Sequence, residues 1–368
     1  MAKNKPLAIG IDDYKRMIDK SYYYVDKTLF LRDLMDKGDG VKLFTRPRRF
    51  GKTLALSMIK TFFEKETDEA GKVTDNSRYF EGMKIMREEK QYTERMGQYP
   101  VIFLSLESAK QPDYKMAYES LLDEIIKEYA RHRYVLLGDA LLGINKEKFT
   151  AIMERRAEPI AYVKSLAFLA ECLKQYHGQN TVILIDEYDV PLENAYFRGF
   201  YDEMIDFIRS LFESALKSND SLEFAVITGC LRISKESIFT GLNNLEIISV
   251  LNVDYAEYFG FTEEEVFEML DFYEMNEKKE VVKRWYDGYQ FGKTEVYNPW
   301  SVINYVNAGL ADYETFPKAY WSNTSSNSII RELVEGADAG MKKEIEELIY
   351  RAVLVIMTEQ RISITDIW

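Results

Sequence analysis

The sequence predicts an α/β fold in which helices cover both faces of a parallel β-sheet. A short apolar strand that starts at Val41 runs into a glycine turn and then into a helix with an apolar face. A second apolar run, residues 181–186, is followed at once by another carboxylate, Glu187. Further apolar strands alternate with helical stretches, and this alternation is typical of a parallel sheet covered by helices.

Residues 41–63, VKLFTRPRRFGKTLALSMIKTFF, form the strand, turn and helix of a phosphate-binding loop, or P-loop. A glycine turn that opens a helix presents backbone N–H groups and the positive end of the helix dipole to an anion. In this context Lys52 would contact the β- and γ-phosphates of a nucleotide, and the Thr53 hydroxyl would bind Mg²⁺. The alternative interpretation is a basic strand-to-helix turn without a ligand.

The loop departs from the general pattern G-x-x-x-x-G-K-[ST] at its first position, where the chain has Arg46. Pro47 follows and removes one backbone N–H from the loop. We expect the positive charges of the loop arginines to offset this loss. The expected nucleotide-binding residues of the loop are Arg46, Arg48, Arg49, Phe50, Gly51, Lys52, Thr53 and Leu54.

The run 181–187, TVILIDE, is typical of a buried parallel strand that ends at a ligand site. Asp186 lies where a Walker B aspartate would hold Mg²⁺, and Glu187 where a carboxylate would orient or activate the attacking water. The alternative is an ordinary core strand that enters an acidic loop. Asp189 continues the acidic cluster, and solvation of the loop is an equally good explanation for it.

The remaining pattern predicts strands at 101–106, 223–229 and 245–251, helical sequence over 114–176, and a helix over 201–217. Asp26 is predicted to cap a helix that ends near Gly38, and Thr262 to open a capping box with Glu265. Residues 291–294 repeat the letters FGKT of residues 50–53. Because no buried strand precedes this copy and no apolar helix follows it, we expect a small hairpin there and not a second phosphate loop.

Composition excludes several function classes. Of 368 residues, 46% are hydrophobic, two are cysteine and two are histidine, so a zinc cluster or a Ser-His-Asp triad has little material. The net charge of −13 argues against strong independent binding to nucleic acid. No signal-peptide pattern and no apolar run of membrane-spanning length is evident, and we expect a cytoplasmic protein that does not cross a membrane.

Five segments together resemble the bacterial AAA-ATPase-like family of P-loop proteins: TRPRRFGKTLALSM, VILIDEYDVPL, FAVITGCLRISKESIFTGLNNLEI, YFGFTEEEV and WYDGYQFGKTEVYNPWSV. The resemblance runs from about Ala8 to the end, and Arg46 agrees with the family's own RPRRFGK form. The family is similar to archaeal-type and STAND ATPases. This implies a P-loop NTPase three-layer sandwich, with an AAA+-like sheet of order 5-1-4-3-2 in residues 1–260.

The resemblance also implies a helical or winged-helix lid in residues 261–335. A linker or the start of a truncated following domain would occupy residues 336–368, because longer members usually continue into a PD-(D/E)XK nuclease-like domain. It implies that Thr228 is a sensor that touches the γ-phosphate or water, and that Arg232 is a charge-neutralising finger. A backbone-satisfying hydroxyl and a loop-anchoring ion pair are equally good explanations for these two residues.

The expected function is Mg²⁺-dependent binding and hydrolysis of ATP. The expected catalytic residues are Lys52, Glu187 and Arg232. ATP and Mg²⁺ are the expected cofactors, and a protein client or self-association the expected macromolecular contact. One alternative is an ATP-binding, STAND-like switch with little turnover. The other is an ATPase module of a nucleic-acid-processing protein whose nuclease-like domain lies outside this chain.

Overall fold

The computed structural model describes residues 5–38, 40–231, 238–239 and 241–320. The chain divides into two compact units, Met1–Ala319 and Tyr320–Trp368, and all that follows concerns the first. The predicted boundary at residues 260 and 261 lies inside this first unit, and the division into core and lid stays a prediction.

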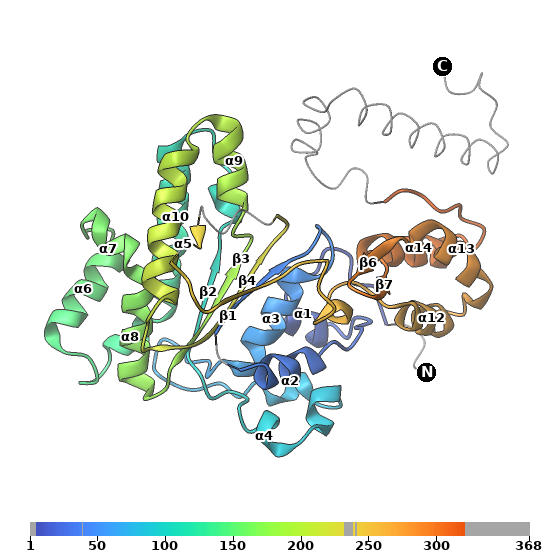
Figure 1. Cartoon of the computed structure of the whole chain (residues 1–368). Helices are drawn as coiled ribbons and strands as arrows, with labels where there is room; N and C mark the ends of the chain where they lie inside the picture. The colour runs from blue at the N-terminus through green and yellow to red at the C-terminus, as the bar shows by residue number, and fades with distance from the viewer. Residues whose placement is uncertain (1–4, 39, 232–237, 240, 321–368) are drawn as a thin grey trace. The chain divides into compact units, whose positions relative to one another are not determined.

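Five parallel strands form the central sheet, and the segments that follow their carboxyl ends build the candidate site (Figure 1). The strands are β1 Val41–Thr45, β2 Val101–Ser105, β3 Thr181–Asp186, β4 Leu222–Gly229 and β5 Leu245–Ile248. Their order is β2-β3-β4-β1-β5, which is the predicted order 5-1-4-3-2 read from the opposite edge. Every residue of β1 and β3 is buried, as expected for strands covered on both faces.

Strand β5 is shorter than predicted. The expected strand reached Leu251, but β5 ends at Ile248. The Asn252 side chain accepts a hydrogen bond from the Ser249 N–H at 2.9 Å, and the Asn252 N–H returns one to the Ser249 carbonyl at 3.1 Å. This local turn ends the ladder and leaves the Leu251 side chain exposed.

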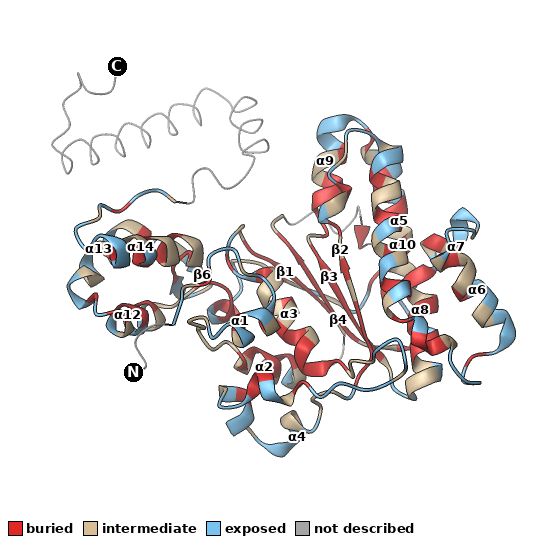
Figure 2. Cartoon of the chain, turned by 180° about the vertical axis from the view of Figure 1, so that it is seen from behind, coloured by how far each residue is buried: buried red, intermediate tan, exposed pale blue. Residues whose placement is uncertain are grey.

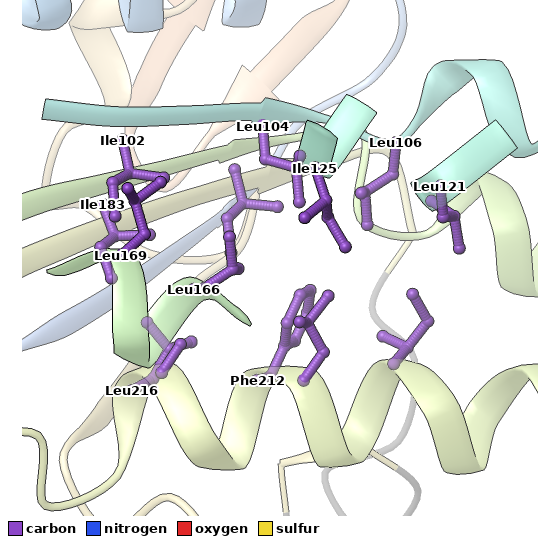
Figure 3. Close-up of a cluster of buried hydrophobic side chains, with 14 of the residues drawn as sticks. Ile102, Leu104, Leu106, Leu121, Ile125, Leu166, Leu169, Ile183, Phe212 and Leu216 are labelled. Atoms are coloured by element: carbon purple, nitrogen blue, oxygen red, sulfur yellow. The ribbon is translucent and has the colours of Figure 1, made fainter. Parts of the chain in front are cut away.

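Successive residues of the strands face opposite layers of helices. On one face, Ile183 and Ile185 join a cluster that includes side chains of helices α5, α8 and α10 (Figure 3). On the other, Val182 and Leu184 join a cluster with helices α2 and α3. Figure 2 shows buried residues along the strands and on the helix sides that face them. This is the three-layer arrangement that the alternation of strands and helices predicts.

The helices have the following bounds: α1 Tyr14–Asp19, α2 Leu29–Asp36, α3 Lys52–Phe63, α4 Lys90–Thr93, α5 Tyr114–Arg131, α6 Gly143–Met153, α7 Pro159–Val163, α8 Ser165–His177, α9 Val190–Arg198, α10 Tyr201–Leu216, α12 Glu263–Phe272, α13 Lys279–Tyr286 and α14 Pro299–Ala311. Short 3₁₀ helices lie at Ser77–Phe80, Lys84–Arg87, Glu107–Ala109, Arg133–Leu136, Ala256–Tyr258 and Asn276–Lys278. No helix among the described residues is long and apolar enough to cross a membrane.

The two predicted helix caps have different outcomes. The capping box is confirmed, because Thr262 and Glu265 exchange side-chain and backbone hydrogen bonds at the start of α12. The cap by Asp26 is wrong, since α2 begins at Leu29. Asp26 instead accepts hydrogen bonds from the Thr28 N–H and from the backbone N–H of Lys84, 58 residues away. One carboxylate oxygen thus bonds Thr28 just before the helix, and the other is held by a tertiary contact.

The second FGKT copy forms the predicted hairpin. Strands β6 Tyr289–Phe291 and β7 Thr294–Val296 pair antiparallel, with Phe291 opposite Thr294. Gly292 has a left-handed φ of 55°, which suits glycine at this turn. Figure 1 shows the hairpin together with α12, α13 and α14. Whether this segment acts as a lid stays a prediction.

Both histidines of the chain join one hydrogen-bonded path. His132 Nε2 lies 3.1 Å from the Val101 carbonyl oxygen, and His132 Nδ1 lies 3.1 Å from the Tyr134 hydroxyl. That hydroxyl lies 2.9 Å from His177 Nε2. Because a carbonyl oxygen only accepts, His132 donates through Nε2. Its unprotonated Nδ1 then accepts from the Tyr134 hydroxyl. The oxygen of that hydroxyl in turn accepts from His177 Nε2. Burial lowers the pKa of His132 and lowers that of His177 to about 4.

The free energy of unfolding is expected to fall as the pH is lowered from about 6.5 toward 4. The imidazoles of the unfolded chain bind protons in this range, whereas His177 in the folded protein stays neutral down to about pH 4. Urea unfolding of the wild type and of His177→Gln between about pH 7 and 5 tests this, and the variant should lose less stability. Equal slopes in the two proteins would contradict a neutral, half-buried His177.

Candidate functional site

The loop from Arg46 to Gly51 joins β1 to α3 through two left-handed residues. Gly51 has a φ of 81°, which glycine adopts without strain, and Arg49 has a φ of 69°. A non-glycine residue in this region is uncommon and persists where its surroundings fix it. The Arg46 N–H donates to the Gly229 carbonyl at 3.0 Å, so the start of the loop is held at the end of β4.

Lys52, the first residue of α3, turns its side chain back into the loop. Its ammonium donates to the carbonyl oxygens of Arg46 and Pro47, both at 3.0 Å, and lies 3.3 Å from the Cys230 sulfur. Only 5% of Lys52 is exposed. The loop therefore surrounds the Lys52 charge at the N-terminus of a 12-residue helix.

The Asp186 carboxylate joins three elements of the core. Its Oδ2 accepts a hydrogen bond from the Thr53 hydroxyl of α3 at 2.7 Å, and its Oδ1 accepts one from the Thr228 hydroxyl of β4. The Glu187 N–H donates to the same Oδ1 at 3.0 Å. Asp186 is 1% exposed. The structure thus brings together Thr53, Asp186 and Thr228, which sequence reasoning assigned to one site.

Glu187 follows Asp186 with a left-handed φ of 52°, so the backbone turns sharply at the end of β3. Burial raises the pKa of its carboxyl to about 7, and the nearby carboxylates of Asp186 and Glu107 add to this shift. Lys52 opposes it. A carboxyl with a pKa near neutrality can exchange a proton at physiological pH, which is what a general base requires.

Asp189 is a buried structural residue and not a solvated loop residue. It is 1% exposed, and its Oδ2 accepts from the backbone N–H groups of Cys230 and Leu231 at 2.9 and 2.7 Å. The Tyr188 hydroxyl donates to the Leu231 carbonyl at 2.7 Å. A Cβ on Gly229 would lie 2.6 Å from Asp189 Oδ1, so glycine permits this close approach. The Tyr188 and Asp189 hydrogen bonds therefore fix the position of the chain just after β4.

The three loop arginines contact protein groups. Arg46 is fully buried, and a phosphate contact by its guanidinium would require rearrangement. Arg48 forms an ion pair with Glu193 of α9 at 3.3 Å. The Arg49 guanidinium lies 4.3 Å from the ring centre of Trp300. Sequence reasoning did not foresee these partners, because each lies far along the chain.

The other predicted site residues have mixed positions. Phe50 is buried against the rings of Tyr289 and Phe291, and Leu54 packs at the margin of the core. Arg232 lies outside the described residues, and its role as a finger stays a prediction. The contact of Cys230 with Lys52 was also missed, since nothing in the local sequence indicates it.

Comparisons with known proteins agree with this geometry. A family model described as "Predicted AAA-ATPase" matches residues 8–239, which is more than half of the chain. The chain is also 29% identical over 335 residues to an "Uncharacterized protein in vnfD 5'region" of Azotobacter chroococcum mcd 1. That match covers 90% of this chain and 56% of the relative, so the chain spans about half the relative's length. The chain belongs to the predicted AAA-ATPase-like family.

Proposed function

We propose that this protein binds ATP with Mg²⁺ at the loop of residues 46–53 and hydrolyses it slowly, to drive a conformational or regulatory change. The observation that carries the proposal is the 2.7 Å hydrogen bond from the Thr53 hydroxyl to the Asp186 carboxylate. It joins the helix after the glycine loop to the end of β3, the pairing that phosphate-binding loops use to hold a metal.

The donor atoms fit Mg²⁺. A hydroxyl and a carboxylate are hard oxygen ligands, and Mg²⁺ usually takes one or two carboxylates, several waters and substrate phosphates. Among the described residues, no three His, Cys, Asp or Glu side chains gather as a metal cage. A metal at Thr53 and Asp186 would therefore depend on the nucleotide, and it would neutralise charge on the phosphates.

Lys52 supports phosphate binding. Its ammonium lies beside the N-terminus of α3, where backbone N–H groups and the helix dipole favour an anion. The carbonyls of Arg46 and Pro47 are its present partners. A phosphate would offer a stronger, charge-assisted hydrogen bond and exchange for these neutral acceptors.

Glu187 is the proposed base. Its carboxyl is partly buried beside Asp186, and its raised pKa matches removal of a proton from water near neutral pH. Thr228 donates to Asp186 and fixes the orientation of that carboxylate, in addition to any contact with phosphate or water.

A second candidate is an ATP-dependent switch with little turnover. It would bind nucleotide and metal through the same Lys52, Thr53 and Asp186 contacts, without proton removal by Glu187. A third candidate, which the resemblance in the sequence raises, is the ATPase module of a nucleic-acid-processing protein. We propose a cytoplasmic location and a protein client or self-association as the partner; acidic net charge disfavours independent nucleic-acid binding.

Lys52→Ala is expected to weaken Mg·ATP binding by about 10- to 150-fold, because a charge-assisted hydrogen bond contributes about 1.5–3 kcal/mol. Isothermal titration calorimetry measures this. Lys293→Ala, at the exposed lysine of the second FGKT copy, is the matched control and should bind like the wild type. A comparable loss in the control, or no loss in Lys52→Ala, would overturn the assignment of the loop.

Glu187→Gln should retain Mg·ATP binding and lose turnover by about 100-fold or more, because it keeps the shape but cannot accept a proton. In the wild type, kcat/KM should rise with pH through about 7, as Glu187 ionises, and level off above. The variant should lose this rise.

Asp186→Asn should instead impair Mg²⁺-dependent binding. A wild type that releases no phosphate would favour the switch, and equal turnover in Glu187→Gln would remove Glu187 as the base.

A further inference from the structure

The phosphate loop has two sides with different neighbours. Lys52 and Thr53 contact groups at the ends of β3 and β4, as described above. Three other loop side chains, those of Arg46, Arg49 and Phe50, contact the C-terminal segment of residues 259–300. The proposed nucleotide site uses the residues of the first side and none of these three side chains.

Phe291 of the hairpin contacts two of these three side chains. Its ring centre lies 5.2 Å from that of Phe50 and 5.1 Å from the guanidinium carbon of Arg46. Phe259 lies 5.1 Å from the same guanidinium, so two aromatic rings contact this cation. Phe291 belongs to the second FGKT copy, and the Phe of one copy therefore packs on the Phe of the other.

The Arg46 guanidinium depends on these rings. It is fully buried and donates to the carbonyl oxygens of Thr45 and Ile248 at 3.0 and 2.9 Å. Its Nε and second terminal nitrogen have no hydrogen-bond partner among the described residues. Burial lowers its pKa to about 10. Burial of a cation is costly, and among the described residues two carbonyl oxygens and two aromatic faces, with no paired carboxylate, compensate this one.

The hairpin is itself held close to the sheet. The Gly292 N–H donates to the Val250 carbonyl at 2.8 Å, and a Cβ on Gly292 would lie 2.6 Å from the Asn252 oxygen. The Gly260 N–H donates to the Phe50 carbonyl at 3.2 Å. Displacement of Phe50 or Arg46 would therefore move the hairpin, and displacement of the hairpin would move the loop.

We propose that Phe291 is a positioning residue for the phosphate loop, and that the hairpin β6–β7 is the element through which the C-terminal segment responds to nucleotide. The inference rests on the proposed function. Arg46, which replaces a glycine of the general pattern, connects the loop to the hairpin and does not contact phosphate. Because coupling between two sites is reciprocal, nucleotide at the loop must stabilise the hairpin as much as the hairpin favours nucleotide.

The test uses Phe291→Leu, which keeps apolar bulk in the core but removes the aromatic face over Arg46. Mg·ATP affinity by calorimetry should fall by about 2- to 30-fold, the range that loss of a cation–π contact of about 0.5–2 kcal/mol gives. Tyr305→Leu is the matched control, because Tyr305 is a buried aromatic residue of α14 that packs on Tyr286 of α13 and contacts no loop residue in the ring pairs given above. It should lower the melting temperature without changing the affinity.

Hydrogen exchange provides a second readout. Amides of residues 289–296 should exchange more slowly with Mg·ATP in the wild type, and this protection should be lost in Phe291→Leu and in Lys52→Ala. Two results would overturn this inference but not the proposed function. One is unchanged Mg·ATP affinity in Phe291→Leu. The other is a wild type that binds Mg·ATP without any change in the exchange rate of the hairpin amides. A wild type that binds no Mg·ATP would overturn the proposed function, and the inference with it.

Discussion

The buried carboxylate of Asp186 is the interaction on which the rest of the site depends. A carboxylate that is 1% exposed must find hydrogen-bond donors, and it takes them from Thr53 of α3, Thr228 of β4 and the backbone of Glu187. Those bonds set the distance between α3 and the sheet and the direction of the turn after β3. Strand β3 thus fixes the position of the phosphate loop, and the proposed metal site uses the same atoms.

The sequence predicted much of this because its signals are local. Apolar runs bounded by turn residues located all five strands, and the strand–glycine–helix pattern placed Lys52 and Thr53 correctly on α3. The two carboxylates after a buried strand placed Asp186 at the carboxyl edge of the sheet. In each case the residues that decide the structure lie within one short stretch of sequence, so no knowledge of distant partners was required.

The parts that were missed depend on contacts between distant residues. One oxygen of the Asp26 carboxylate binds a backbone amide 58 residues away, and α2 begins only at Leu29. Asp189 has the sequence context of a solvated loop, and only the fold shows that it holds the chain after β4. Arg46 illustrates this most clearly, since charge alone suggests a phosphate, whereas burial between Phe259 and Phe291 assigns it to packing. Spacing along the chain carries no information on such pairs.

The interleaved strand order has a consequence for biosynthesis. Strand β1 lies between β4 and β5, so both of its partners, Leu222–Gly229 and Leu245–Ile248, are made long after it. During translation, the apolar edges of β1 stay unpaired while about half of the chain is made. The phosphate loop that follows β1 also lacks its partners during this time. Such non-local pairing raises the contact order, slows folding and exposes the nascent chain to aggregation.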